Sequence, residues 1–364
     1  MTVETADRAE ALAERMFESM TGLMDMAAVY IGDCLGLYRA LGSAPDRTSE
    51  ELARRTGTNE RMVREWLEHQ AAGGLLEVAD PAVDASERRY RLPQGAEEVF
   101  LDPESLAYGM PLARYGVGLL RPMDDLVRAF RDGRGVLADA YGDDVREAQA
   151  AVNRPQFTHL LASEWLPTMP EVHARLQADP AARVADIACG GGWSSIAMAR
   201  AYPKVHVDGF DLDAPSIELA IANAATAGVE DRVKFHVRDA GDPSLAGEYD
   251  LVTAFEAIHD LSQPTHVLRT MRALAGDDGA VLVLDERTHD RFTPNTDTME
   301  RALYGYSVLF CLPTAMVDQP SAATGTVMRA ETMERYARDA GFERTEILPV
   351  EHPQFRLYRL RWEL

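Results

Sequence analysis

Positive charge is scarce in this chain. Its 364 residues include 59 aspartates and glutamates but only 37 lysines and arginines, which gives a formal net charge of −22 at pH 7. Proteins that bind nucleic acid or anionic lipid do so through clustered Lys and Arg. The composition therefore argues against both as the main partner, and it favours a small molecule.

Cysteine is scarce too. Cys34, Cys189 and Cys311 are far apart, odd in number and without CxxC spacing, so neither a disulfide framework nor a structural zinc site is indicated. The chain also lacks an apolar run long enough to span a bilayer, and its N-terminus lacks the basic-then-apolar pattern of a signal peptide. We therefore expect a cytoplasmic protein with no membrane partner.

The chain is too long for one ordinary domain, so two hydrophobic cores are expected. Its hydrophobic content of 46% and charged content of 26% are those of a globular protein.

Glycine gathers at one informative place. The apolar run from Val184 to Ala188 predicts a buried parallel strand, and Gly190, Gly191 and Gly192 follow it almost directly. These glycines allow a ligand to approach the backbone closely. Residues 195–201 then have the composition of a helix. The order strand, glycine turn, helix is typical of nucleotide-binding folds.

This turn lacks the signatures of phosphate-binding loops. No Gly-Lys-Ser/Thr follows the glycines, which excludes a P-loop, and Ser195 stands at the third position of the dinucleotide fingerprint. Asp186, inside the end of the strand, would repel a pyrophosphate but attract an ammonium group. S-adenosylmethionine carries an ammonium and a sulfonium group and no phosphate, so it fits this turn better than a dinucleotide.

Acidic residues also end the next three predicted strands. In parallel sheets, ligands bind outside the carboxyl ends of the strands, and an acid about twenty residues beyond the glycines binds ribose hydroxyls in doubly wound nucleotide folds. Asp211 has that spacing. The predicted strands span residues 205–210, 233–237 and 249–255, and the acids that follow them are Asp211, Asp239 and Glu256.

These motifs resemble the class I S-adenosylmethionine-dependent methyltransferases, and among them the small-molecule O-methyltransferases with an N-terminal winged-helix dimerisation domain. The resemblance covers nearly the whole chain and is strongest from Val184 to Phe342. It implies an α/β fold with a Rossmann-like seven-stranded methyltransferase sheet and an N-terminal, mostly helical winged-helix domain. The implied domains are 1–105 for dimerisation, 106–175 for connecting helices that roof the active site, and 176–364 for S-adenosylmethionine binding.

The resemblance also implies where S-adenosyl-L-methionine is held. The glycine turn cradles its methionine part, the acid at Asp211 holds the ribose, and the acid at Asp239 contacts the adenine amine. Ala188 replaces the first glycine of the usual Asp-x-Gly-x-Gly-x-Gly, but contacts there use mainly backbone, so we expect binding to survive. The expected donor-binding residues are Asp186, Ala188, Gly190, Gly192, Asp211, Leu212, Asp239, Ala240 and Phe255.

The N-terminal region has more apolar surface than one domain needs. Apolar residues recur at helical spacing over residues 11–41, with an expected break near Thr21-Gly22. We predict that part of this surface forms a homodimer, although packing within its own domain stays open. Predicted helices at 49–57 and 59–73, followed by strands at 75–78 and 90–92, give a helix-turn-helix with a wing.

The second of these helices bears on nucleic-acid binding. It offers Arg61 and Arg64, but also Glu60, Glu65 and Glu68, which would repel phosphate. We therefore expect a structural and dimerising role, and no nucleic-acid partner.

Helices are predicted over residues 103–130 and 153–176, and a fifth buried strand over 280–285. The aromatic segment 304–313 has two equally weighted interpretations, a lid over the methyl acceptor or plain core. Residues 345–350 and 354–362 predict an antiparallel pair at the sheet edge.

Methyl transfer to a hydroxyl needs a base with a pKa near the working pH. His259 follows the fourth strand, and Ile258-His259-Asp260-Leu261 resembles the His-Asp-Trp segment of plant-type O-methyltransferases, in which that His is the general base. Leu261 stands where the family prefers Trp. The expected catalytic residues are His259, Asp260 and Glu286, and Glu256 is a further candidate to orient the base or the substrate.

Other interpretations stay open at this point. His259 could instead hydrogen-bond only to backbone. The same fold supports C- or N-methylation, sometimes with a metal that His259, Asp260 and His289 could in principle hold. A non-enzymatic, ligand-sensing winged-helix regulator is a third class. The acceptor itself is not readable from the sequence.

Overall fold

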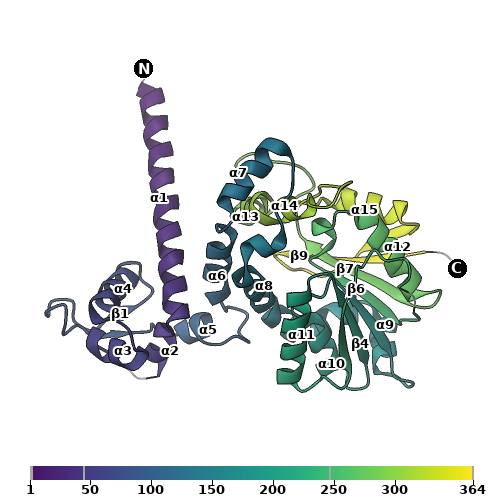
Figure 1. The fold of residues 1–364 in the computed structure, drawn as a ribbon, viewed down its shortest axis with the longest axis horizontal. Coiled ribbons are helices and arrows are strands. Elements are labelled where there is room, and N and C mark those ends of the chain that lie inside the picture. The colour runs from purple at the N-terminus through teal and green to yellow at the C-terminus, as the bar shows by residue number, and fades with distance from the viewer. Residues whose placement is uncertain (1–2, 44–45, 246, 363–364) are drawn as a thin grey trace. The chain divides into compact units, whose positions relative to one another are not determined.

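The computed structural model describes residues 3–43, 46–245 and 247–362, so the first and last residues of the predicted domains, 1 and 364, lie outside it. The backbone forms two compact units, Met1–Gly118 and Leu119–Leu364 (Figure 1). Each is described by itself. The three-part division by role, at 105/106 and 175/176, stays a prediction.

The N-terminal unit is mostly helical. Its core surrounds Tyr38, Leu52 and Leu67, all nearly inaccessible to solvent. Its elements are α1 (Val3–Cys34), α2 (Leu37–Gly42), α3 (Ser49–Thr56), α4 (Glu60–Ala72), β1 (Glu77–Val78), β2 (Tyr90–Arg91), α5 (Ala96–Phe100) and all but the last residue of α6 (Met110–Leu119).

The predicted helix-turn-helix with a wing is confirmed in this unit. Thr48 caps α3 and forms a reciprocal capping box with Glu51, while the Asn59 side chain accepts a hydrogen bond from a backbone N–H in the first turn of α4. β1 and β2 pair antiparallel and form the wing. On α4, Arg61 and Arg64 form ion pairs with glutamates one turn away along the same helix.

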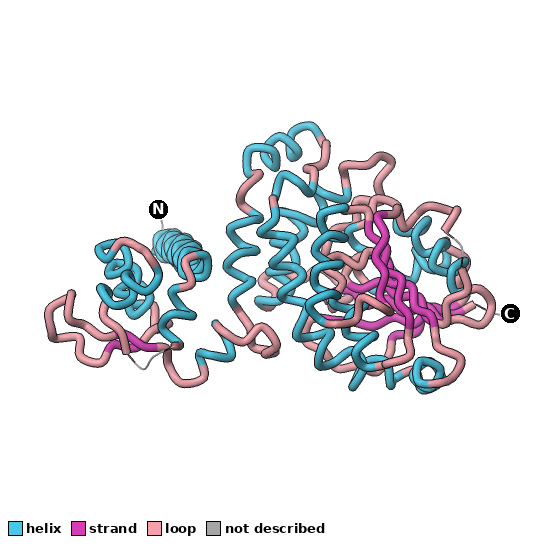
Figure 2. The backbone as a smooth tube through the Cα atoms, turned by 60° about the horizontal axis from the view of Figure 1, so that its bottom comes forward, coloured by secondary structure: helices cyan, strands magenta, loops and turns pink. Residues whose placement is uncertain are grey.

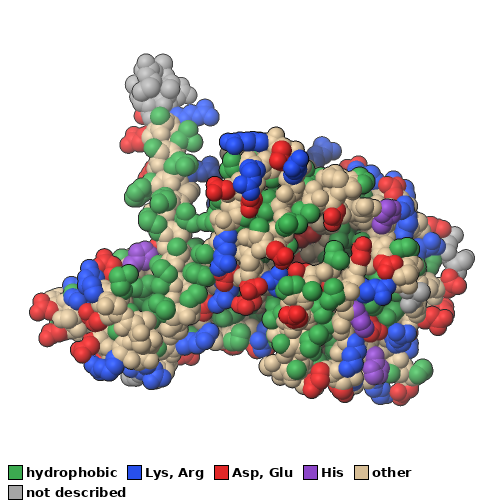
Figure 3. Space-filling model, in the orientation of Figure 1, with side chains coloured by type: hydrophobic (Ala, Val, Ile, Leu, Met, Phe, Trp, Pro, Cys, Tyr) green, Lys and Arg blue, Asp and Glu red, His purple; other side chains and the backbone are tan. Residues whose placement is uncertain are grey.

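The first helix differs from its prediction. α1 runs unbroken through Thr21-Gly22, and the chain turns only at Gly36, which has a left-handed φ of 65°. The predicted break was wrong because one glycine lowers helix stability by only about 1 kcal/mol, which a long helix tolerates. Large apolar side chains lie exposed along this helix (Figure 3), among them Leu12, Met16, Phe17, Met20, Leu23, Met24 and Ile31.

The C-terminal unit is built on a seven-stranded mixed sheet with the order β5-β4-β3-β6-β7-β9-β8. The first five strands in that order are parallel, and β9 runs antiparallel to both of its neighbours. This confirms the predicted fold class and the terminal antiparallel pair. The strands are β3 (Arg183–Ile187), β4 (His206–Asp211), β5 (Val233–Val237), β6 (Leu251–Phe255), β7 (Ala280–Glu286), β8 (Arg344–Ile347) and β9 (Phe355–Arg361).

Helices cover both faces of this sheet (Figure 2). Two predicted helices are interrupted. The one over 103–130 begins only at Met110 and is interrupted at residues 120–122, between α6 and α7, and the one over 153–176 is divided into several pieces around a π-helical stretch. Proline explains the first break, since it has no N–H to donate. The helical elements are α7 (Met123–Asp132), η1 (Ala138–Tyr141), α8 (Asp143–Gln156), η2 (Phe157–Trp165), η3 (Leu166–Thr168), α9 (Pro170–Gln177), α10 (Trp193–Ala201), α11 (Ala214–Ala227), η4 (Ile258–Asp260), α12 (Pro264–Ala275), α13 (Thr298–Tyr306), η5 (Ser307–Cys311), α14 (Leu312–Ala315) and α15 (Ala330–Asp339).

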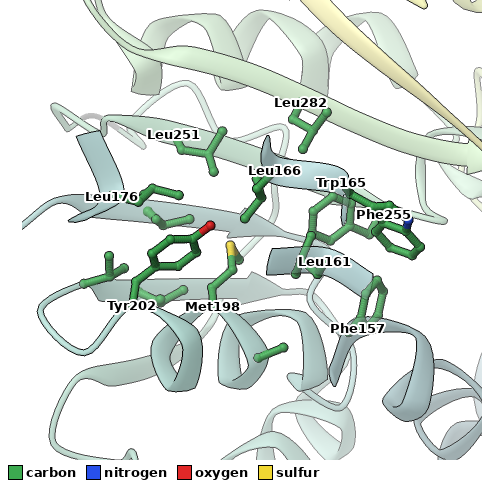
Figure 4. Packing of buried hydrophobic residues seen from close by; sticks show 14 of the residues in the cluster. Phe157, Leu161, Trp165, Leu166, Leu176, Met198, Tyr202, Leu251, Phe255 and Leu282 are labelled. Atoms are coloured by element: carbon green, nitrogen blue, oxygen red, sulfur yellow. The ribbon is translucent and has the colours of Figure 1, made fainter. Parts of the chain in front are cut away.

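Alternate residues of the central strands belong to two separate hydrophobic cores, one on each face of the sheet. Val184, Leu251 and Leu282 point to the face covered by η2, α9 and α10, where Trp165 and Phe157 pack against Phe255 (Figure 4). The intervening strand residues pack on the other face against α12 and α15. Burial on both faces explains why these strands are continuously apolar, and it fixes the position of their carboxyl ends, where the polar residues gather.

Candidate active site

A cavity of about 280 Å³ lies at the carboxyl ends of β3, β4 and β6. This is where the chain passes from one side of β3 to the other, the place at which open α/β sheets bind ligands. Seven of the predicted site residues line this cavity. They are Asp186, Ala188, Gly190, Gly192, Asp211, Phe255 and Asp260.

The glycine turn contains three residues with positive φ angles, and only two of them are glycines. Gly190 and Gly192 have positive φ angles of 49° and 77°, and so does Ala188, at 52°. Ala188 stands where the resembled family has glycine, and its left-handed conformation costs an L-residue roughly 1–2 kcal/mol. A Cβ on Gly192 would lie 2.5 Å from the Phe235 ring, whereas one on Gly190 would meet no atom within 4 Å. The turn is thus tight on its protein side and open at Gly190.

Asp186 ties the turn to the following helix. Its carboxylate is buried and accepts hydrogen bonds from the hydroxyls of Ser194 (2.5 Å), Ser195 (2.6 Å) and Thr253 (2.8 Å). Burial raises the pKa of Asp186, although these hydrogen bonds oppose the shift. The carboxylate therefore fixes β3 against the first turn of α10.

Asp211 ties the same turn to β4. It accepts hydrogen bonds from the backbone N–H groups of Gly190 (2.8 Å) and Asp213 (2.9 Å), and burial raises its pKa. Asp213 caps α11 and forms an ion pair with Arg146 at 2.7 Å. A carboxylate has about four acceptor sites, so Asp211 keeps acceptor capacity for hydroxyl groups in the cavity.

Three predicted donor-binding residues do not line this cavity. The Leu212 side chain is 65% exposed. Asp239 is exposed and accepts a hydrogen bond from the N–H of Gly241, and Ala240 beside it is buried. Their roles toward the donor stay predictions.

His259 lies between two carboxylates. Its Nδ1 is 2.6 Å from an oxygen of Asp285, and its Nε2 is 3.1 Å from an oxygen of Asp260. The imidazole is 2% exposed and is not part of the cavity wall, whereas Asp260 is. Burial lowers the pKa of His259, but the charges of Asp260 and Asp285 outweigh it and raise this pKa well above its ordinary value. The interpretation of His259 as a residue that only bonds backbone is therefore wrong.

Two glutamates lie beside this group. Glu256 lines the cavity with a left-handed φ of 52°, and its buried Oε1 has no hydrogen-bond partner among the described residues. Its Oε2 has only a long contact, 3.4 Å, to the Gln149 amide. Burial raises the pKa of Glu256 to about 8. Burial and the charge of Glu256 raise the pKa of Glu286 well above its ordinary value, although Glu286 is not in the cavity wall.

The sequence did not reveal several cavity residues. Arg146, Gln149 and Asn153 come from one side of α8, which nothing in the chain's periodicity links to the strand ends. The pairing of Asp285 with His259 had a signal that could have found it, because Asp285 lies at the end of β7, next to β6. In segment 304–313, Phe310 lines the cavity while Cys311 is buried, so the segment contributes to both the cavity wall and the core. Its role as a lid over the acceptor stays a prediction.

The structure regroups the candidate metal ligands. His259 and Asp260 lie with Cys311, their ligand atoms all within 4.8 Å of one another. His289 is not in this group and pairs with Asp297 at 2.8 Å. The predicted ligand set that included His289 is therefore wrong. Among the described residues, none of the helices is both long and apolar enough to cross a bilayer.

Comparison with known proteins agrees with this architecture. Residues 178–333 match the methyltransferase domain family, and residues 22–101 match the Rv2258c-like winged helix-turn-helix domain family. The ubiquinone biosynthesis O-methyltransferase of Aeromonas salmonicida is 32% identical over 101 residues, which are 28% of this chain and 42% of that protein. This chain spans less than half the length of the first curated relatives that it matches.

Solved structures are similar over nearly the whole chain. The mitomycin 7-O-methyltransferase MmcR has a TM-score of 0.64 at 20% identity, covering 98% of this chain and 99% of that one. Human N-acetylserotonin methyltransferase, solved with S-adenosylmethionine, has a TM-score of 0.64 at 19% identity, covering 96% and 98%. At these identities the likeness establishes the fold.

Proposed function

Because the chain belongs to the methyltransferases that carry an N-terminal winged-helix domain, we propose that it transfers a methyl group from S-adenosylmethionine to a hydroxyl of a small-molecule acceptor. The observation that carries the proposal is one cavity in which the glycine turn and Asp211 lie at one end, with Glu256 and Asp260 at the other. The first group suits the donor, and the second suits the acceptor.

The residues present fit this donor. The open side of Gly190 lets a ligand approach the backbone, and the free acceptor sites of Asp211 suit ribose hydroxyls. The carboxylate of Asp186 favours a cationic ligand and disfavours a phosphate, whereas that of Asp213 is already paired with Arg146. When bound, S-adenosylmethionine supplies the electrophilic methyl group.

The acceptor proton goes to a group of residues and not to a lone imidazole. In its neutral form the His259 imidazole keeps a lone pair on Nε2, the nitrogen next to Asp260, so the imidazole can take one proton. Asp260 faces the cavity, His259 lies behind it, and Asp285 holds the imidazole in place through Nδ1. We assign neutral His259 as the general base that acts through Asp260, with Glu286 shaping its surroundings. Because the pKa of His259 is raised, this base form becomes more populated as the pH rises.

Two measurements test this function. Calorimetry should show S-adenosylmethionine binding with no preference for NAD, and formation of S-adenosylhomocysteine should depend on a compound from a panel of phenols, amines and keto acids. Donor binding without turnover on any of these would favour the ligand-sensing alternative. Preferential binding of NAD would overturn the proposal.

We also propose a homodimer formed through α1. The exposed residues Leu12, Met16 and Met20 recur every four positions and so share one side of the helix, and a stripe of this kind is unusual on a monomer. A dimer mass by light scattering at micromolar concentration is expected. Phe17→Glu should shift the mass toward the monomer, and a monomeric wild-type protein would contradict the assignment.

A further inference from the structure

The carboxylates at the acceptor end of the cavity have no Lys or Arg partner among the described residues that line it. Among the described residues that line the cavity, Arg146 is the one basic side chain. Its guanidinium group forms ion pairs with Asp213 and Asp143, at N–O distances of 2.7 and 2.6 Å. It therefore neutralises the donor end and leaves Glu256 and Asp260 uncompensated by any Lys or Arg in the wall.

The residues behind the wall do not supply the missing charge. Burial raises the pKa of Glu256, and the charges of Asp285 and Asp260 raise it further, while the charge of His259 opposes them; Glu256 in turn raises the pKa of Glu286. Among the described residues, His259 is the one positive charge that lowers the pKa of both glutamates, and it is already shared between Asp260 and Asp285. Four carboxyl groups thus surround one imidazole.

Glu256 has neither an ion pair nor a short hydrogen bond among the described residues. One oxygen each of Asp260 and Asp285 also lacks a hydrogen-bond partner, but both of those side chains lie against His259. A buried carboxyl group without a partner holds its proton unless a cation or donor meets it, which agrees with the raised pKa of Glu256. Its left-handed φ of 52° adds backbone strain. Both features are typical of a position kept for a ligand.

Three aromatic rings, those of Phe157, Phe255 and Phe310, line the same cavity, together with aliphatic residues such as Ala257 and Leu261. Phenylalanine faces exclude water, and they attract cations through the ring quadrupole. The combination of an unpaired carboxylate with aromatic walls suits an organic cation better than a hydrated metal ion.

Given the proposed methyl transfer, on which this depends, we infer that the acceptor is a small aromatic or alkaloid-like molecule carrying a protonated amine, which Glu256 binds next to the hydroxyl to be methylated. Glu256 is then a residue that determines specificity, while the group of His259, Asp260 and Asp285 takes the proton.

The test uses the whole chain saturated with S-adenosylhomocysteine, so that the donor end is filled. Saturation itself is measured first, and its failure would count against the proposed function and not against the acceptor class. Ligand-observed NMR at millimolar concentration then compares matched triples of phenols whose side arm ends in an ammonium, a hydroxyl or a carboxylate.

The expected result is binding of the ammonium member about tenfold or more tighter than its neutral partner, with the carboxylate member weakest. Glu256→Gln should reduce that ratio to about twofold or less while changing the affinity for S-adenosylhomocysteine less than twofold. Glu218→Gln, which removes an equivalent charge from the exposed side of α11, is the matched control and should keep the full ratio.

Three results would overturn the inference. The first is equal or tighter binding of the neutral or anionic members, or no binding of the ammonium members. The second is a preference for the ammonium members that survives Glu256→Gln. The third is an equal loss of S-adenosylmethionine affinity in that variant, which would assign Glu256 to the donor sulfonium or ammonium group instead.

Discussion

The carboxylates at the two ends of the cavity differ in how many of their oxygens the protein itself uses. At the donor end, Asp186 accepts three hydroxyl hydrogen bonds and Asp211 accepts two from backbone N–H groups. At the acceptor end, Glu256 has one oxygen without a partner and one long contact. Carboxylates whose oxygens are hydrogen-bonded within the protein hold the backbone in place, and carboxylates with free oxygens remain available to a ligand and to proton transfer.

The largest expected effect is on the turnover rate, when His259 near the acceptor end is replaced. His259→Ala removes the proton acceptor behind Asp260, so turnover should fall roughly 10²–10⁴-fold, the usual contribution of a positioned base. Donor affinity should stay nearly unchanged, because His259 is outside the cavity wall. Stopped-time assays of S-adenosylhomocysteine, together with calorimetry, measure the two quantities. Loss of folding would make the residue structural, and full turnover would mean that proximity alone drives the reaction.

At the donor end the expected effect is on binding. Asp211→Ala removes the proposed bonds to ribose and the bond to the Gly190 N–H, so S-adenosylmethionine binding should weaken by roughly 1.5–3 kcal/mol. Asp239→Ala is the matched comparison, because that acid is exposed and outside the cavity wall. Calorimetry on both variants should rank Asp211 first. Unchanged affinity in Asp211→Ala would remove it from the donor site.

A third test uses pH and stability. Since the pKa of Glu256 is raised from 4.5 to about 8 on folding, the folded state binds more protons than the unfolded state between those values. The group's contribution to stability is therefore fully present below about pH 4.5 and is lost as pH rises through about 8. Glu256→Gln cannot ionise, so it should be more stable than wild type by roughly 1–3 kcal/mol at pH 9, with a smaller difference at pH 5. Denaturant unfolding at both pH values measures this gap.

The matched variant Glu218→Gln should show no such gap, because that side chain is exposed. A pH-independent difference in Glu256→Gln would mean that the carboxyl group of Glu256 is not desolvated in the folded protein.

The same contrast explains what the sequence could predict. The central strands β3, β6 and β7 were predictable because both of their faces are buried, which leaves apolar runs that end in acids such as Asp186 and Glu256. The side chains that complete the cavity, Gln149 among them, were not, because α8 reaches the strand ends only through tertiary packing. The sequence also could not show which carboxylates are fully hydrogen-bonded, because that depends on the donors that folding brings to each of them.

The smallest effect is expected in the glycine turn, at two nearby positions that share a left-handed backbone conformation. Ala188 and Gly190 have φ angles of 52° and 49°. Ala188→Gly relieves a left-handed strain of roughly 1–2 kcal/mol but adds unfolded-state entropy worth about 0.4–1 kcal/mol, so a net stabilisation of about 0.5–1 kcal/mol is expected.

Gly190→Ala is the opposite substitution, because it adds a Cβ where Ala188→Gly removes one. Its Cβ would meet no protein atom within 4 Å, so steric overlap adds nothing, and the φ angle alone should destabilise the protein by roughly 1–2 kcal/mol. The same Cβ would, however, enter the open side of the turn, so donor affinity should fall in Gly190→Ala and stay unchanged in Ala188→Gly. Thermal unfolding and calorimetry separate the two quantities. If both variants change stability in the stated directions but neither changes donor affinity, the turn is only a structural frame and the donor is held by other residues.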